Sequence, residues 1–103
     1  MQSELIRVLT LANTEFASKG LQILGYFGSF ARGDERADSD LDILYELQPE
    51  AYRQYPGWSI VRLLEEVRQK LENELQMPVD LVDKDSLREV GNKYILPELI
   101  HVA

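Results

Sequence analysis

The chain has 103 residues, with 11 Lys or Arg against 18 Asp or Glu, and therefore a formal net charge of −7. From this length we expect one domain with one core and no separate substrate domain, and the absence of cysteine excludes disulfides and thiolate metal sites. The acidic balance argues against nucleic acid as the main ligand, because that binding depends on cationic side chains that neutralise phosphates, and it fits a basic protein partner better.

The first part of the chain predicts a helix followed by a buried strand. Residues 1–4 lack a basic region followed by an apolar one, and no apolar run approaches membrane-spanning length, so cytoplasmic residence is the default expectation. The apolar run 21–27 predicts a strand covered on both faces, and Gly25 within it marks a close backbone approach. Before it, four apolar residues recur at helical spacing until Gly20: Leu5, Leu9, Ala12 and Phe16.

The stretch of residues 28–42 carries the clearest chemistry. Asp40 and Asp42 belong to a run that predicts a second strand over residues 41–45, so their carboxylates should point to one face. Without a counter-charge two such carboxylates repel each other, and a divalent cation would remove the conflict.

The beginning of the same stretch favours an anionic ligand. Gly28 allows the backbone to approach a ligand closely, and Ser29 can cap a helix whose free N–H groups attract phosphate. Since Mg²⁺ prefers one or two carboxylates together with substrate phosphates, the two halves together predict a nucleotide site.

The residues between these halves allow more than one interpretation. Residues 30–32 should form one helical turn that ends at Gly33. The guanidinium of Arg32 has the planar fork suited to phosphate, or it forms a salt bridge with Asp34 or Asp38. Arg36 is a weaker candidate, and the acidic residues of the loop are most simply solvated: Asp34, Glu35 and Asp38.

The middle of the chain predicts a loop and then a long structural helix. Residues 48–57 contain two prolines and a final glycine, which mark a loop. Its Tyr52 and Tyr55 could stack on a base, face a partner, or be ordinary surface aromatics. After Trp58, the apolar residues fall on one side of a helix: Ile60, Leu63, Leu64, Val67, Leu71 and Leu75.

A third strand is expected over residues 78–82, and it contains an acidic residue. Asp80 lies among apolar neighbours that should be buried, so a carboxylate there needs a reason. Because it alternates with its neighbours, it could simply face outward. Asp83 and Asp85 are expected to serve as turn and helix-cap residues.

The tail predicts an interrupted helix and an apolar finish. We expect a helix from residue 85 that Gly91 and Asn92 interrupt, and a second helix with Pro97 in its first turn. The apolar residues of 99–103 need cover from the core or from a partner subunit. The single histidine, His101, is expected to be packed or interfacial rather than catalytic.

The pattern of residues 28–42 resembles that of a known superfamily. A Gly-Ser pair, ten residues and then Asp-x-Asp, set between two strand-like runs, is similar to the signature of polymerase-beta-like nucleotidyltransferases. With Ala31-Arg32-Gly33 and Ser39-Asp40-Leu41-Asp42, the segment resembles the minimal nucleotidyltransferases (MNT), which are encoded beside a HEPN partner as toxin–antitoxin pairs. The resemblance implies an α/β (α+β) fold in which helices flank a small mixed β-sheet, with residues 1–103 forming a single minimal nucleotidyltransferase domain.

The same resemblance implies an enzyme and its site. Proteins of this kind transfer AMP from ATP to a tyrosine hydroxyl of their HEPN ribonuclease toxin, with two Mg²⁺ ions, and so silence it. The resemblance implies Asp40 and Asp42 as ligands of both ions, and Asp80 as the third metal ligand that also helps to remove the acceptor proton. It assigns the β- and γ-phosphates to three residues: Gly28, Ser29 and Arg32.

Two alternative functions remain open at this point. The chain could be an antitoxin that neutralises its toxin by stoichiometric binding alone, with an active site that is retained or idle. It could also modify a small hydroxylated molecule such as an aminoglycoside. We rank that possibility last, because such family members generally carry an added substrate-binding domain that 103 residues cannot hold.

Overall fold

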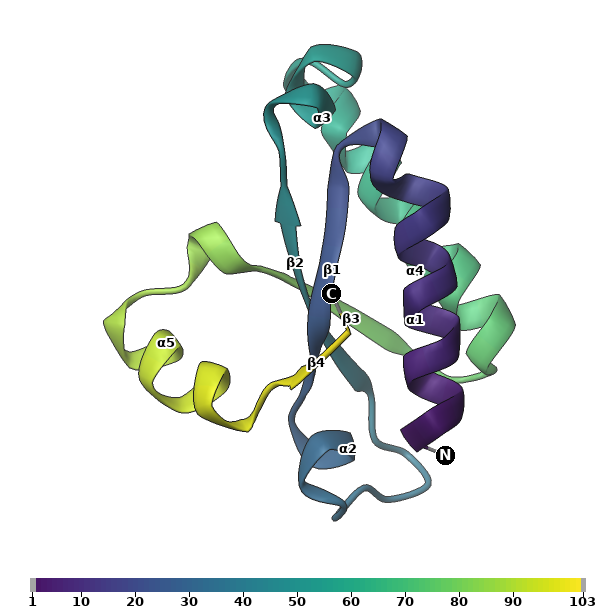
Figure 1. Ribbon diagram of the computed structural model, residues 1–103, viewed down its shortest axis with the longest axis vertical. Helices are drawn as coiled ribbons and strands as arrows, with labels where there is room; N and C mark the ends of the chain where they lie inside the picture. The colour runs from purple at the N-terminus through teal and green to yellow at the C-terminus, as the bar shows by residue number, and fades with distance from the viewer. Residues whose placement is uncertain (1, 103) are drawn as a thin grey trace.

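The computed structural model describes residues 2–102 and contains helices and strands in alternation (Figure 1). The helices are α1 (Gln2–Phe16), α2 (Ser29–Arg32), α3 (Pro49–Gln54), α4 (Ile60–Leu75) and α5 (Glu89–Ile95). The strands are β1 (Leu21–Phe27), β2 (Leu41–Leu47), β3 (Val79–Asp83) and β4 (Ile100–His101). Short 3₁₀ turns lie between them, of which η4 (Leu96–Glu98) matters below.

The four strands form one mixed sheet in the order β3-β2-β1-β4. β1 runs antiparallel to β2 and to β4, whereas β2 and β3 run parallel. A parallel pair needs a long crossover connection, and α3 and α4 supply it here. The expected α+β fold with a small mixed sheet and flanking helices is therefore confirmed.

The main core lies between the sheet and the helices α1 and α4, which pack side by side on one face (Figure 1). The helical spacing predicted an apolar core face on each helix, and residues of these faces are buried: Leu5, Leu9, Ala12 and Phe16 of α1 and Leu63, Val67 and Leu71 of α4. Leu41 and Ile43 of β2 point into the same core and are fully buried. The largest helical contributors are Leu5, Leu9, Phe16, Leu63 and Leu71.

A smaller apolar cluster covers the other face of the sheet. Phe27 and Leu44 are buried there against Leu99, and Ile95 and Leu96 pack around them. These last three residues come from the C-terminal part of the chain, which in Figure 1 lies on the side of the sheet away from α1 and α4. Leu99 is thus covered by the core of this chain itself, and Ile100 and Val102 are half-buried against the main core, while residue 103 lies outside the described residues.

An irregularity divides β1 into two parts. The pairing of β1 with β2 shifts register between Ile23 and Gly25, so Leu24 is the extra residue of a β-bulge. A Cβ atom on Gly25 would lie 2.1 Å from the carbonyl oxygen of Ile100, which confirms the close backbone approach expected there. Beyond the bulge, Tyr26 points into the main core and Phe27 into the smaller cluster.

The expectation of a loop over residues 48–57 was wrong, because the first half of that stretch is helix α3. Pro49 occupies the first helical turn, where its missing N–H costs nothing and its fixed φ suits a helix. Tertiary contact adds to this local preference: Ala51 is fully buried, and the Gln48 N–H donates to the Gly20 carbonyl at 2.7 Å.

The predicted layout of the tail was correct only in part. α5 begins at Glu89 rather than at residue 85, because Asp83 caps a 3₁₀ turn by accepting from the Asp85 N–H at 2.8 Å. The helix runs through Gly91 and Asn92 without the expected interruption. Pro97 does lie in the first turn of η4, and His101 is exposed on β4 rather than packed.

Candidate functional site

The sheet brings two of the predicted acidic residues together directly. Asp42 is the pairing partner of Phe27 across the antiparallel β1–β2 pair and of Asp80 across the parallel β2–β3 pair. Paired residues of neighbouring strands point to the same face, so Asp42 and Asp80 lie beside each other at one end of the sheet. Asp40 immediately precedes β2, two residues before Asp42.

Gly28 brings the backbone of β1 against the Asp42 carboxylate. Its φ of 77° and ψ of −152° fall in a region that is essentially restricted to glycine. A Cβ atom at this position would lie 2.2 Å from Asp42 Oδ2. Two independent constraints, one of conformation and one of space, therefore require glycine where the chain turns past the acidic pair.

The short helix α2 differs in one detail from the expectation. Gly28, which has no side chain, is the N-cap, and Ser29 is the first helical residue, so Ser29 does not cap the helix. The Ser29 carbonyl instead accepts from the N–H groups of Gly33 and Asp34, at 2.9 and 3.0 Å. Gly33 has a φ of 81° and ends the helix as predicted.

A pocket of about 650 Å³ opens at this end of the sheet. It brings together five of the six predicted site residues, namely Gly28, Ser29, Arg32, Asp40 and Asp42. The sixth, Asp80, is exposed beside Asp42 and is not one of the lining residues. Besides Phe27, the pocket is lined by four residues that the sequence did not point to: Ser39, Tyr94, Ile95 and Glu98.

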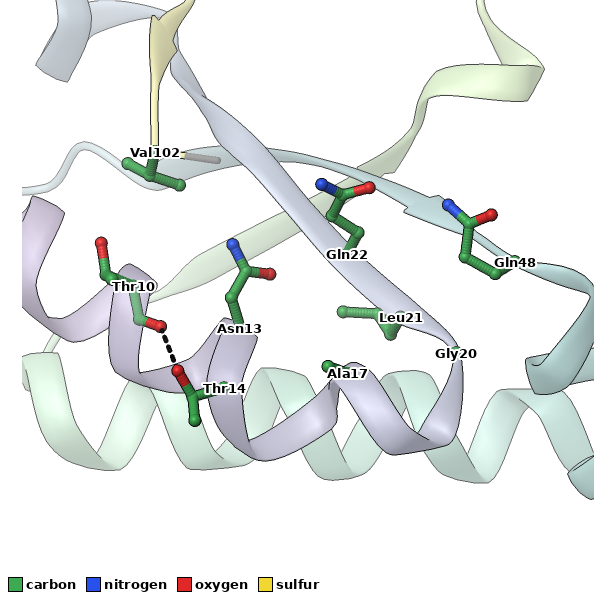
Figure 2. Close-up of a pocket in the computed structure, with 9 residues that line it drawn as sticks. All are labelled: Thr10, Asn13, Thr14, Ala17, Gly20, Leu21, Gln22, Gln48 and Val102. Carbon is green, nitrogen blue, oxygen red and sulfur yellow. Dashed lines mark hydrogen bonds between the residues drawn. The ribbon is translucent and has the colours of Figure 1, made fainter.

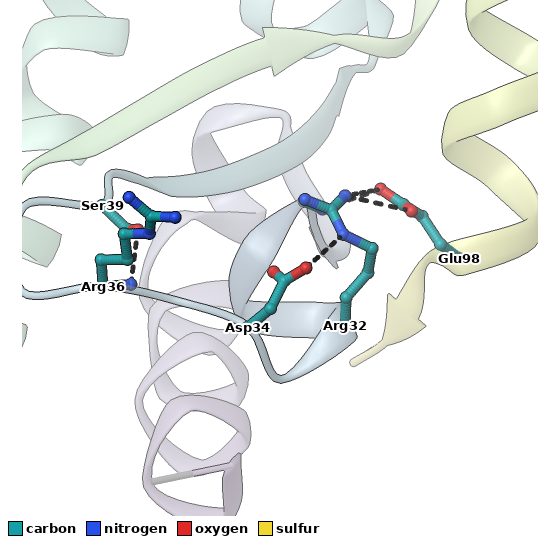
Figure 3. A network of polar contacts seen from close by, with 6 residues as sticks. Arg32, Asp34, Arg36, Ser39 and Glu98 are labelled. Atoms are coloured by element: carbon teal, nitrogen blue, oxygen red, sulfur yellow. Dashed lines mark hydrogen bonds and ion pairs between the residues drawn. The ribbon is translucent and has the colours of Figure 1, made fainter.

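Arg32 is paired with two carboxylates from different parts of the chain (Figure 3). Its Nε lies 3.3 Å from Asp34 Oδ2, and its Nη1 lies 3.4 Å from both carboxylate oxygens of Glu98. The carboxylate of Asp34, and then that of Glu98, raises the pKa of the Arg32 guanidinium. The salt bridge with Asp34, which the sequence left open as an alternative to phosphate binding, is thus present, while the contact with Glu98 was not predicted.

Asp42 lies in an environment that disfavours its negative charge. Burial raises the pKa of its carboxyl group, and the nearby charges of Asp80 and Asp40 raise it further, whereas Arg32 acts in the opposite direction. Charge repulsion among neighbouring carboxylates is the condition under which a bound cation has most to stabilise. The arrangement therefore matches the electrostatic conflict that the Asp-x-Asp spacing predicted.

The carboxylates do not form a metal cage by themselves. Within residues 2–102, no group of three or more His, Cys, Asp or Glu side chains is arranged to hold a metal ion. Mg²⁺ is usually held by one or two carboxylates and completes its shell with substrate phosphates and water. Asp40 and Asp42 line the same pocket as Gly28 and Arg32, and this combination of carboxylates with phosphate-binding groups fits that kind of shared site.

The other candidates of the sequence lie elsewhere. Arg36 donates its N–H to Ser39 Oγ at 2.8 Å, as Figure 3 shows, and its loop is exposed as expected. Tyr52 and His101 are exposed, and Tyr55 is half-buried; all three lie away from the pocket lining. In the part of the chain that the structure describes, no helix combines the length and the apolar character needed to cross a lipid bilayer.

A second pocket of about 500 Å³ lies between α1 and the start of β1 (Figure 2). None of its described lining residues is charged, and none was predicted as a site residue. Its main polar group, the Asn13 amide, is already used: it donates to the Ile23 carbonyl at 2.9 Å and accepts from the Ile23 N–H at 2.6 Å. Asn13 thus provides hydrogen-bond partners for the backbone of Ile23 in β1, and its role in this pocket is structural.

Comparison with known proteins points to one family. The model of the family described as "Nucleotidyltransferase domain" matches residues 13–100. The chain is 34% identical to the protein adenylyltransferase MntA of Thermococcus cleftensis over 100 residues, which cover 96% of this chain and 93% of that protein. It is 35% identical over 80 residues to a "putative protein adenylyltransferase" of Methanocaldococcus jannaschii, covering 77% of this chain and 74% of the other.

A solved structure shares the fold. A "putative minimal nucleotidyltransferase" superposes with a TM-score of 0.70 at 26% sequence identity, over 91% of this chain and 88% of that one. The order of helices and strands described above is therefore found in a protein determined independently of this one.

Proposed function

The chain belongs to the nucleotidyltransferase domain family, and from this premise we propose that it is an antitoxin that transfers AMP from ATP to a tyrosine hydroxyl of a HEPN ribonuclease toxin. The observation that carries the proposal is the single pocket that Asp40 and Asp42 line together with Gly28 and Arg32. The relative from Thermococcus cleftensis is a protein adenylyltransferase, and this supports a protein as the acceptor. The net charge of −7 suits a partner with a cationic, RNA-binding surface.

In this proposal one wall of the pocket holds the triphosphate. Gly28 offers a backbone N–H, and its lack of a side chain lets a phosphate approach the turn. Ser29 adds a hydroxyl at the pocket surface, and Arg32 supplies a guanidinium that can bind two phosphate oxygens at once. These groups would fix the β- and γ-phosphates, so that the α-phosphorus is held in line for the acceptor oxygen. As the tyrosine oxygen bonds to the α-phosphorus, the bond from that phosphorus to the oxygen of the β-phosphate would break and pyrophosphate would leave.

The acidic residues of the site would bind two Mg²⁺ ions. Asp40 and Asp42 are the residues that would hold the magnesium, and Asp80, next to Asp42 in the sheet, is the proposed third ligand. Bound magnesium would neutralise phosphate charge and make the acceptor hydroxyl easier to deprotonate. Asp80 would accept the proton of that hydroxyl, and its exposed position leaves it accessible to a protein acceptor.

The test is transfer of label to the partner. The chain is incubated with Mg²⁺, α-labelled ATP and the protein encoded beside it, and label should appear on a tyrosine of that protein. An Asp40→Asn/Asp42→Asn variant should lose the transfer, while Asp38→Asn, which removes an exposed charge from the same loop, should keep it. Equal labelling by all three proteins would refute the assignment of the site.

One observation supports the binding-only alternative. The Arg32 guanidinium and the Gly28 N–H already have a partner within the chain, Glu98, as an idle site would. The same two variants separate the alternatives. If the Asp40→Asn/Asp42→Asn variant still neutralises the toxin completely at equimolar ratio, the chain acts by occlusion rather than by AMP transfer.

A further inference from the structure

The C-terminal part of the chain places an anion on the donors of the proposed phosphate site. Glu98 Oε1 accepts a hydrogen bond from the Gly28 N–H at 3.0 Å. Both oxygens of the same carboxylate lie 3.4 Å from Arg32 Nη1, as the dashed lines in Figure 3 show. One carboxylate thus joins a backbone N–H and a guanidinium that are separated from it by 70 and 66 residues of chain.

The segment that carries Glu98 is held in place on both sides. On its N-terminal side, Ile95 and Leu96 pack against Phe27 and Leu44 in the smaller apolar cluster. On its C-terminal side, Leu99 is buried in that cluster and β4 pairs with β1. The backbone around Glu98 is therefore fixed, whereas its side chain is 29% exposed and can rotate into solvent. The fold itself therefore positions Glu98 to contact Gly28 and Arg32.

The balance of charge in the pocket gives this contact a consequence. Arg32 is the only cationic side chain among the described lining residues, which also include the carboxylates of Asp40, Asp42 and Glu98. An entering polyphosphate needs the donors that Glu98 occupies, and the backbone N–H of Gly28 is a single donor that cannot serve the Glu98 carboxylate and a phosphate at the same time. Phosphate and Glu98 must therefore exclude each other.

We propose that Glu98 is an internal competitor of the nucleotide. Its carboxylate occupies the Gly28 N–H and the Arg32 guanidinium in the free protein, and a nucleotide phosphate binds there when Glu98 has rotated away. The inference rests on the proposed function for the position of the phosphates. In this proposal Glu98 lowers the affinity for the nucleotide, and in the free protein it holds the Gly28 N–H and the Arg32 guanidinium in the positions in which they bind phosphate.

A purely structural role for Glu98 predicts a different outcome, and Glu98→Gln separates the two. The glutamine amide oxygen can still accept from the Gly28 N–H, so the turn keeps its support, but the negative charge is lost. If Glu98 competes with phosphate, this variant binds phosphate more tightly. If Glu98 only supports the turn, the variant binds phosphate equally or more weakly.

The experiment is calorimetric titration of the full chain with three probes in the presence of Mg²⁺: ATP, inorganic tripolyphosphate and adenosine. Glu98→Gln should bind ATP and tripolyphosphate about three- to tenfold more tightly than the unmodified chain, as expected for loss of one partly exposed competing charge. Adenosine, which has no phosphate, should bind both proteins alike. Glu89→Gln is the matched control, because it removes one exposed charge from neighbouring α5 and should leave all three affinities unchanged.

Each result decides the matter. Unchanged or weaker binding of tripolyphosphate by Glu98→Gln, while the unmodified chain still binds ATP, would overturn the competitor and leave the proposed function intact. If neither protein binds ATP or tripolyphosphate, the proposed function fails and the competitor fails with it. Glu98→Ala, compared by thermal unfolding, serves as a second variant: if folded, it should also bind tripolyphosphate more tightly.

Discussion

Replacing Gly28 by alanine should abolish AMP transfer at a modest cost in stability. The new Cβ atom would lie 2.2 Å from Asp42 Oδ2, well inside contact distance, so the carboxylate has to move away from its position in the pocket. The backbone adds a second cost, because a φ of 77° with a ψ of −152° is strained for any residue with a side chain, by about 1–3 kcal/mol. In a domain of this size each kcal/mol lowers the melting temperature by roughly 4–8 °C.

Gly33→Ala is the control that separates strain from steric conflict. Gly33 has a φ of 81°, so alanine there is strained as well, by about 1–2 kcal/mol, but a Cβ atom would meet nothing within 4 Å. Both variants should therefore lose stability in urea unfolding, while only Gly28→Ala should lose transfer of label from α-labelled ATP. The reasoning is refuted if Gly28→Ala, assayed where it is folded, labels the partner as well as Gly33→Ala does.

Three further predictions follow from the charges and from one buried tyrosine. Asp42→Asn should raise the free energy of unfolding in the absence of metal, since burial and the charge of Asp80 disfavour the charged Asp42 carboxylate, while transfer is lost; lower stability in urea would contradict this. Arg32→Ala should weaken ATP binding about tenfold or more in calorimetry, whereas Arg36→Ala should change it little; equal effects would argue against the phosphate role. Burial raises the pKa of Tyr45 to about 12 from 10.0, so its neutral form stabilises the fold fully below pH 10 and this stabilisation is lost as the pH rises to about 12. In Tyr45→Phe, the decrease in the free energy of unfolding between pH 10 and about 12 should be smaller by about 2 kcal/mol. If the two proteins gave parallel curves of stability against pH, Tyr45 would not be the cause of that decrease.

The parts of the fold that repeat along the chain could be predicted from the sequence. The apolar spacing of α1 and α4 and the runs of β1, β2 and β3 each carry their own local signal, and all five elements are present. Leu41 and Ile43 are buried opposite Asp42, as the alternation of a strand requires. Helix α3 was missed because Pro49 is as common in the first turn of a helix as in a loop, and the burial of Ala51 decides between them.

The candidate site likewise contains residues that the sequence could predict and residues that it could not. The segment 28–42 contains its own pattern, so five residues that line the pocket could be proposed from it. Asp80 could be assigned to the same site as Asp42 only through the resemblance to the nucleotidyltransferases. Glu98 gave no signal, because its partners, Gly28 and Arg32, are 70 and 66 residues away and no periodicity connects them. Strand β4, with two residues, is likewise too short to leave a pattern.

The bulge at Leu24 explains why the turn at Gly28 lies against the Asp42 carboxylate. In a strand of uninterrupted pairing, Ile23 and Phe27 would face the same side, and Phe27 would point between α1 and α4. Because Leu24 is an additional residue, every side chain of β1 that follows it points to the opposite face of the sheet. Tyr26 therefore lies in the main core, and Phe27 lies beside Asp42 on the other face. The site of this small protein thus depends on one additional residue in β1. With regular strand pairing the core could still form, but the end of β1 would point away from the carboxylates of the site.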